Sequence, residues 1–123
     1  MKIRSHKEQI VFKNSFELAL QIHLLSKEFP PEEKYSLTDQ LRRSSRSVSS
    51  NIAEAFRKRR YAKSFISKLS DSEGEAAETQ VWISFALAFG YLDEIIAKEL
   101  EEKYVQLEKQ IVTMTLNPEK WSI

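Results

Sequence analysis

The chain has 123 residues, a formal net charge of +1 and 30% charged residues, and this length favours one domain with a single hydrophobic core. It contains no cysteine, which excludes disulfides, zinc–thiolate sites and thiol catalysis, and its two histidines disfavour a histidine-based metal cluster. Two glycines and three prolines offer few turning points for a strand-rich fold, so the composition favours helices.

The first predicted helix covers residues 9–28. Apolar residues recur there at three- and four-residue spacing, which puts them on one stripe of a helix. The stripe predicted to be buried consists of Phe12, Phe16, Ala19 with Leu18, Ile22, Leu25 and Phe29. His23 lies beside it without a partner motif, and we interpret it as a partly buried structural residue. Pro30-Pro31 ends the helix because proline has no backbone donor.

The second predicted helix covers residues 37–60, with Ser36 as its N-cap and Asp39 near the positive end of the helix dipole. Its predicted buried stripe is Leu37, Leu41, Ser44 with Ser45, Val48, Ile52 and Ala55 with Phe56. Serine is a poor residue for a helix interior, so the density of serines at positions 44, 45, 47, 49 and 50 indicates that neighbouring helices approach closely there.

The third predicted helix covers residues 63–89. Its predicted buried stripe is Phe65 with Ile66, Leu69, Ser72, Ala76, Gln80 with Val81, Ile83 and Leu87. Gly74 lies inside this helix at a cost of about 1 kcal/mol relative to alanine, which is tolerable where a neighbouring backbone packs close. Gly90 matches the left-handed position that follows a helix, with Tyr91 or Leu92 as the next apolar contact.

The fourth predicted helix covers residues 93–115, and Asn117-Pro118 ends it. Its predicted buried stripe is Ile96, Leu100, Tyr104, Leu107, Ile111 and Met114, and Trp121 is the tail residue expected to be held in place. Four helices of this length with short connections predict an all-α, antiparallel up-down-up-down four-helix bundle, a single domain over residues 1–123.

Charge is strongly segregated along the chain. Residues 40–70 contain nine Lys or Arg and one acid, a net charge of +8, whereas residues 71–110 contain ten acids and three Lys, a net charge of −7. Such segregation suits either complementarity within or between subunits or a basic surface directed at phosphate. The second helix is predicted to carry a basic ridge, whose candidate nucleic-acid-binding residues are Arg42, Arg43, Arg46, Arg57, Lys58, Arg59, Arg60 and Lys63.

Catalytic and metal-binding motifs are absent from the sequence. The third helix contains four acids, but no Glu-x-x-His motif accompanies them, so a solvated face or a partner for the basic ridge is favoured over a metal site. These acids are Asp71, Glu73, Glu75 and Glu78. There is also no Gly-rich phosphate loop and no nucleophile elbow. We therefore expect a protein that is not an enzyme and needs neither metal nor cofactor.

Asn51 and Glu54 lie within one helical turn of the stripe residues Val48, Ile52 and Ala55, so both are predicted to be at least partly buried. Buried polar groups need partners, and a structural hydrogen-bond network that fixes helix register is favoured here over a functional site. The N-terminus lacks an apolar stretch of signal-peptide length, and no segment approaches the roughly 20 apolar residues of a membrane span. A cytoplasmic protein with no membrane association is expected.

The second helix resembles the signature of a known family. Its sequence LTDQLRRSSRSVSSNIAEAFRKRR is similar to that of the bacterial four-helix-bundle proteins encoded within intervening sequences of 23S ribosomal RNA genes. The resemblance covers most of the chain, from Phe16 through FPPEEKYSLTDQLRRSS and NIAE to the FGYLD that follows the third helix. The same family is similar to the accessory variability determinant of diversity-generating retroelements.

The resemblance implies a left-handed bundle, assembly as a ring-shaped homopentamer, and binding of structured RNA, ribosomal RNA or an RNA-handling partner. The residues that it carries over are Arg42, Arg43, Asn51, Glu54, Arg57, Arg59 and Arg60. Two hypotheses stay open. One is a non-enzymatic, ribosomal-RNA-associated protein that binds phosphate through the basic ridge. The other is a structural, oligomeric interaction protein whose basic second helix docks on acidic surfaces of neighbouring subunits.

Overall fold

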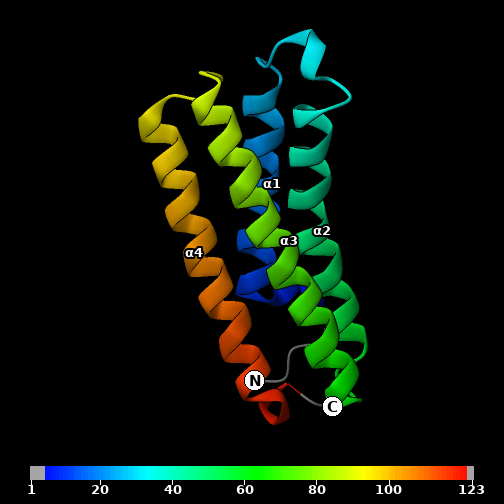
Figure 1. Ribbon diagram of the computed structural model, residues 1–123. Coiled ribbons are helices and arrows are strands. Elements are labelled where there is room, and N and C mark those ends of the chain that lie inside the picture. Colours follow the sequence, from blue (N-terminus) through cyan, green and yellow to red (C-terminus); the bar gives the residue numbers. More distant parts are fainter. Residues whose placement is uncertain (1–4, 122–123) are drawn as a thin grey trace.

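Residues 5–121 are described by a computed structural model, and their regular structure is entirely helical (Figure 1). The long helices are α1 (Ile10–Ser26), α2 (Leu37–Arg57), α3 (Ala62–Ala88) and α4 (Glu94–Leu116), and the short 3-10 helices are η1 (His6–Glu8), η2 (Pro31–Glu33) and η3 (Pro118–Lys120). Each long helix packs against the next one in sequence, and α4 also packs against α1. The predicted all-α, up-down-up-down four-helix bundle is confirmed.

The second helix ends at Arg57 rather than at the predicted Arg60. Lys58 leaves the helical conformation with φ −99° and ψ 9°, and its backbone N–H still bonds the Ala55 carbonyl oxygen at 3.0 Å. The Tyr61 N–H then bonds the Lys58 carbonyl oxygen at 2.9 Å, which closes a turn over residues 58–61. This turn reverses the chain without glycine or proline, and it puts a run of basic residues at one end of the bundle.

The connection from α3 to α4 follows the predicted chemistry. Gly90 has φ 81°, the Tyr91 N–H bonds the Ala86 carbonyl oxygen at 2.8 Å, and the Gly90 N–H bonds the Leu87 carbonyl oxygen at 3.0 Å. These two bonds form a Schellman motif. The Asp93 carboxylate then accepts a 2.9 Å hydrogen bond from the Ile96 N–H and caps α4.

The structure differs from the sequence analysis in detail at Ser36 and Gly74. Ser36 is the N-cap residue of α2, but its side chain makes no capping hydrogen bond; the Leu37 N–H is instead 3.4 Å from a carboxylate oxygen of Glu33. A closely packed backbone would compensate for Gly74, but within residues 5–121 a Cβ at this position would meet nothing within 4 Å, so no such contact is present there.

The buried faces of α2 and α4 match the predicted stripes closely. All the predicted stripe residues of α2 are buried. In α4 the one difference is that Ala97 is buried where the prediction had Ile96. Trp121 packs against the edge of this core, as expected. In α3 the buried positions include Thr79 and Ala86 rather than the predicted Gln80 with Val81 and Leu87.

The predicted buried stripe of α1 is confirmed for Leu18, Ile22 and Phe29 but wrong for Phe16, because the buried face is shifted by about one residue in the first half of the helix. The face that α1 buries consists of Val11, Ser15, Leu18, Ile22 and Ser26, so Phe16 is 51% exposed. The reason is that small hydroxyl residues occupy the interior where helices approach closely. Ser15 of α1 and Ser49 of α2 are hydrogen-bonded at 2.8 Å, as are Thr79 of α3 and Ser44 of α2. The serine-rich part of α2 is therefore a close-packed interface, as its sequence indicated.

Candidate nucleic-acid interface

The candidate nucleic-acid-binding residues fall into separate groups in the structure. Arg42 turns toward α1, where its Nε donates a 2.8 Å hydrogen bond to Ser26 Oγ and its Nη2 lies 3.4 Å from the His23 carbonyl oxygen. Arg43 turns the opposite way, toward α3, and forms ion pairs with Glu75 at 3.3 Å and with Glu78. Both guanidinium groups therefore hold helices together, and the acids of α3 serve in part as partners of the basic ridge, as predicted.

Arg46 lies on the outer surface between these two residues and reaches back to α1. Its Nη2 is 3.3 Å from His23 Nδ1. Partial burial, followed by the positive charges of Arg42, Lys27 and Arg46, lowers the pKa of His23. The neutral imidazole can accept the hydrogen bond from Arg46, so His23 has the structural role that its sequence position suggested.

The remaining basic residues gather at the turn between α2 and α3. We call Arg57, Lys58, Arg60 and Lys63 the end-of-α2 cluster; all four are exposed. Within residues 5–121, no ion pair joins any of them to an acid. Arg59 differs, because it is half-buried and its guanidinium lies 3.8 Å from the centre of the Phe56 ring. The structure thus divides the predicted ridge into an internally bonded part and an exposed cluster.

The polar pair Asn51 and Glu54 behaves only partly as predicted. Asn51 is half-buried, and its Nδ2 donates a 2.9 Å hydrogen bond to the Ser47 carbonyl oxygen one turn earlier. Glu54 is exposed, so the prediction of burial was wrong for this residue, because α3 packs beside it without covering it. Its carboxylate pairs with Lys68 of α3 at 2.8 Å, and the hydrogen bond from Lys68 lowers the pKa of Glu54. The Asn51 contact lies within α2, and the Glu54 contact joins α2 to α3, so both are structural contacts.

The described part of the chain contains no group of three or more His, Cys, Asp or Glu that could hold a metal ion. None of the helices within residues 5–121 is long and apolar enough to cross a membrane.

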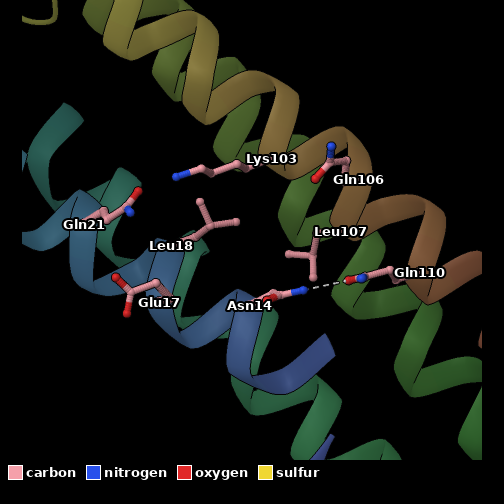
Figure 2. Close-up of a pocket in the computed structure, with 8 residues that line it drawn as sticks. All are labelled: Asn14, Glu17, Leu18, Gln21, Lys103, Gln106, Leu107 and Gln110. Atoms are coloured by element: carbon pink, nitrogen blue, oxygen red, sulfur yellow. Dashed lines mark hydrogen bonds between the residues drawn. The ribbon is translucent and has the colours of Figure 1, made fainter. Parts of the chain in front are cut away.

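Two grooves run along α1, one on each side, and they differ in chemistry. The groove toward α4 has a volume of about 260 Å³ and is walled mainly by amides (Figure 2). Asn14 of α1 reaches across it to Gln110 of α4 at 3.3 Å, with Leu18 and Leu107 between the two helices. Lys103 is the one cation in this wall and Glu17 the one acid, so the groove has no excess of positive charge for phosphate.

The groove toward α2, which we call the α1–α2 groove, is larger and mostly apolar. It has a volume of about 590 Å³ and is lined by His6, Phe12, Phe16, Ala19, Leu20, His23, Arg46, Ser49, Ser50 and Ala53. The apolar pattern of the sequence did not indicate this groove, because it predicted both Phe12 and Phe16 to be buried, whereas Phe12 is only partly buried and Phe16 is exposed. The alternative stripe through Ser15 was the available signal, since serines in α2 already indicated close helix contacts.

Comparisons with known proteins agree with this architecture. A crystal structure of a protein with unknown function from the S23 ribosomal protein family, from Bacteroides thetaiotaomicron VPI-5482, superimposes with a TM-score of 0.78 and 26% sequence identity. The match covers 86% of this chain and 95% of that one. Among curated proteins none matches. The model of the 23S rRNA-intervening sequence protein family matches residues 7–113, and the chain belongs to that family.

Proposed function

We propose that this protein is a non-enzymatic, ribosomal-RNA-associated protein that binds the phosphates of structured RNA through the end-of-α2 cluster. The observation that carries the proposal is the exposure of these four cations at a single turn, without an acidic partner in ion-pair distance within residues 5–121. Cations that are not neutralised internally attract a polyanion, because each phosphate contact releases condensed counterions. The family name, which refers to 23S rRNA, supports an RNA context.

The other ridge residues contribute less under this proposal. Arg42 already donates hydrogen bonds to Ser26 and His23 on α1, and Arg43 to Glu75 and Glu78 on α3. Moving either residue to a phosphate would break those bonds, whereas Arg57 or Arg60 can meet a phosphate at no such cost. An association with ribosomal RNA also implies a cytoplasmic location.

Homo-oligomerisation is part of the proposal, with the pentamer implied by the family resemblance as the expected size. The outer face of α3 supports it, because exposed uncharged residues recur there at three- and four-residue spacing. They are Ser67, Ser70, Gly74, Ala77, Val81, Ser84 and Ala88. In a chain with 30% charged residues, such a seam suits packing against a helix of another subunit. Assembly would also multiply the RNA contacts.

The alternative is a purely structural protein whose α2 docks on acidic surfaces of neighbouring subunits. One observation favours it: the ion pairs of Arg43 with Glu75 and Glu78 demonstrate that cations of α2 and acids of α3 are complementary in this chain. Under this alternative the end-of-α2 cluster would bind acids of the next subunit instead of phosphate.

A salt titration of RNA binding distinguishes the two functions. For the unmutated protein, the logarithm of affinity for an RNA hairpin should fall linearly with the logarithm of salt concentration, by roughly 0.7 to 0.9 per phosphate contact. The triple change Arg57→Gln, Lys58→Gln and Arg60→Gln should flatten this slope and leave the molecular mass in solution unchanged.

The matched control removes the same amount of charge from internally bonded residues, through Arg42→Gln, Arg43→Gln and Lys68→Gln. It should retain most of the RNA affinity, provided that circular dichroism shows a folded protein. If the unmutated protein has no measurable RNA affinity at about 50 mM salt, where non-specific binding is strong, the RNA-binding function is rejected. If the cluster triple change instead dissociates the oligomer, the structural alternative is correct.

A further inference from the structure

The α1–α2 groove combines an apolar floor with a positive charge at its edge, which Arg46 supplies. Phe16 and Leu20 of α1 are 51% and 46% exposed, although both are large apolar side chains. The groove volume of about 590 Å³ lies within the range of small-molecule and single-residue binding sites. No acid is among the described side chains that line it, and Arg46 stands at its edge beside the neutral His23. A ligand that fits this surface has a flat or apolar body and negative charge.

The aromatic rings of the groove form a series along α1. The His6 and Phe12 rings meet edge to face, with centroids 4.7 Å apart and an interplanar angle of 73°. The Phe12 and Phe16 rings follow at 5.9 Å and 32°. Phe16 ends the series at the solvent. Exposed aromatic faces of this kind stack on nucleic-acid bases irrespective of sequence, because every base has a π-face.

The opposite wall of the groove is a single stripe of α2. Arg46, Ser50, Ala53 and Arg57 follow one another at intervals of three or four residues, so they share one face of the helix. Arg46, Ser50 and Ala53 line the groove, and the small side chains of Ser50 and Ala53 leave it open beyond Arg46; Arg57 continues the same stripe outside the groove. Arg46 and Arg57 are separated by roughly 16 Å along the helix axis at about 1.5 Å per residue. Arg57 belongs to the end-of-α2 cluster and lies one helical turn beyond Ala53, the last residue of α2 that lines the groove, so the same face of α2 leads from the groove to the cluster.

We propose that the α1–α2 groove binds an unpaired base of RNA, which stacks on Phe16, while Arg46 and Arg57 contact the phosphates on either side of it. This inference rests on the proposed RNA association and names the part of the RNA that is recognised. A paired base offers only its edges, because its faces are stacked within the duplex, whereas bases of loops, bulges and single strands can enter a groove lined by aromatic residues. The protein should therefore prefer RNA with unpaired nucleotides near a helical stem.

The test compares two RNA probes of equal length and charge, a hairpin with a bulged 2-aminopurine nucleotide and a fully paired duplex. The unmutated protein should bind the bulged hairpin more tightly and quench the 2-aminopurine fluorescence as this base stacks. Phe16→Ala should weaken binding of the bulged hairpin by about 5- to 150-fold, the effect expected for losing one stacked base, and abolish the quenching. Its affinity for the duplex should stay the same.

Phe85→Ala is the matched control, because Phe85 lies on α3 outside the groove and is 46% exposed. It should change neither affinity. A second variant, Ser50→Glu, keeps every aromatic ring and introduces negative charge at an exposed position of the groove wall. It should also weaken binding of the bulged hairpin selectively. Circular dichroism confirms that each variant is folded.

The remaining outcomes separate this inference from the proposed function. Equal binding of both probes, unaffected by Phe16→Ala but lost in the end-of-α2 triple variant, would overturn the groove inference and leave the RNA-binding function intact. A change of oligomeric mass in Phe16→Ala without a change in RNA affinity would overturn it as well, since the groove would then be a contact between copies. Failure of the unmutated protein to bind either probe would reject both.

Discussion

The hydroxyl of Ser72 on α3 donates a 2.8 Å hydrogen bond to the backbone carbonyl oxygen of Val48 on α2, and both residues are fully buried. A side chain can bond the backbone of a neighbouring helix in this way only where the two helices are very close. The small size of Ser72 is therefore as important as its polarity, because a larger residue at this position would meet the backbone of α2.

Ser72→Val should destabilise the protein by about 1–3 kcal/mol, since extra methyl groups in a filled interior force the helices or their side chains to shift. The control is Ser70→Val on the exposed face of α3, which carries the same change in helix propensity and is measured at a low protein concentration, so that the outer seam of α3 is not occupied by another subunit. That variant should stay within about 0.5 kcal/mol of the unmutated protein. Urea unfolding measures both values, and equal effects of the two changes would show that the α2–α3 contact is looser than described.

Gly74→Ala should raise the free energy of unfolding by about 0.5–1 kcal/mol. Alanine is the better helix residue, and its Cβ would meet nothing within 4 Å in the described part of the chain. Gly90→Ala is the opposite case, because φ 81° strains any residue with a Cβ, and it should lower stability. Thermal unfolding of the two variants at low protein concentration tests this contrast. A destabilising Gly74→Ala that also reduces the molecular mass would indicate that another subunit packs on this position.

Tyr104→Phe should leave stability unchanged or raise it by about 1 kcal/mol. Tyr104 is fully buried at the centre of α4, and its hydroxyl has no hydrogen-bond partner within residues 5–121. Burial also raises the pKa of this phenol, so the hydroxyl stays protonated and remains a hydrogen-bond donor without an acceptor within residues 5–121. Removing the hydroxyl removes its desolvation cost. A loss of more than about 1 kcal/mol on urea unfolding would mean that the hydroxyl is hydrogen-bonded to water in solution.

His23 should make the protein less stable as the pH falls through about 6.5, the ordinary histidine pKa. Its pKa is lowered in the folded state by burial and by the charges of Arg42, Lys27 and Arg46. The unfolded chain therefore takes up a proton first, and the stability from the neutral imidazole is present above pH 6.5 and lost as pH falls toward the lowered value. His23→Gln should remove this part of the pH dependence. Superimposable profiles of both proteins from about pH 8 to about pH 5.5 would contradict it.

The repeating pattern of apolar residues alone predicted the helices, their order and the buried faces of α2 and α4. In α4 the spacing of Leu100, Tyr104, Leu107 and Ile111 admits only one buried face, because the residues between them are polar or charged or lie on the opposite side. The Gly90 and Asp93 motifs were equally readable, since each depends on a few neighbouring residues and on local backbone geometry.

The tertiary structure decided which side chains are buried and which charges are paired, because both depend on the neighbouring helix that faces each residue. In α1 both Phe16 and Ser15 have the spacing of a buried residue, and Ser15 is the buried one because Ser49 of α2 approaches it to 2.8 Å. The basic ridge illustrates the same principle for charge. Arg43 and Arg57 are both basic residues of α2, yet only Arg43 meets acids on the neighbouring helix, whereas Arg57 reaches the turn where α3 no longer covers it. Helical periodicity determines the direction of a side chain, but the neighbouring helix determines whether its charge is neutralised or left available to a ligand.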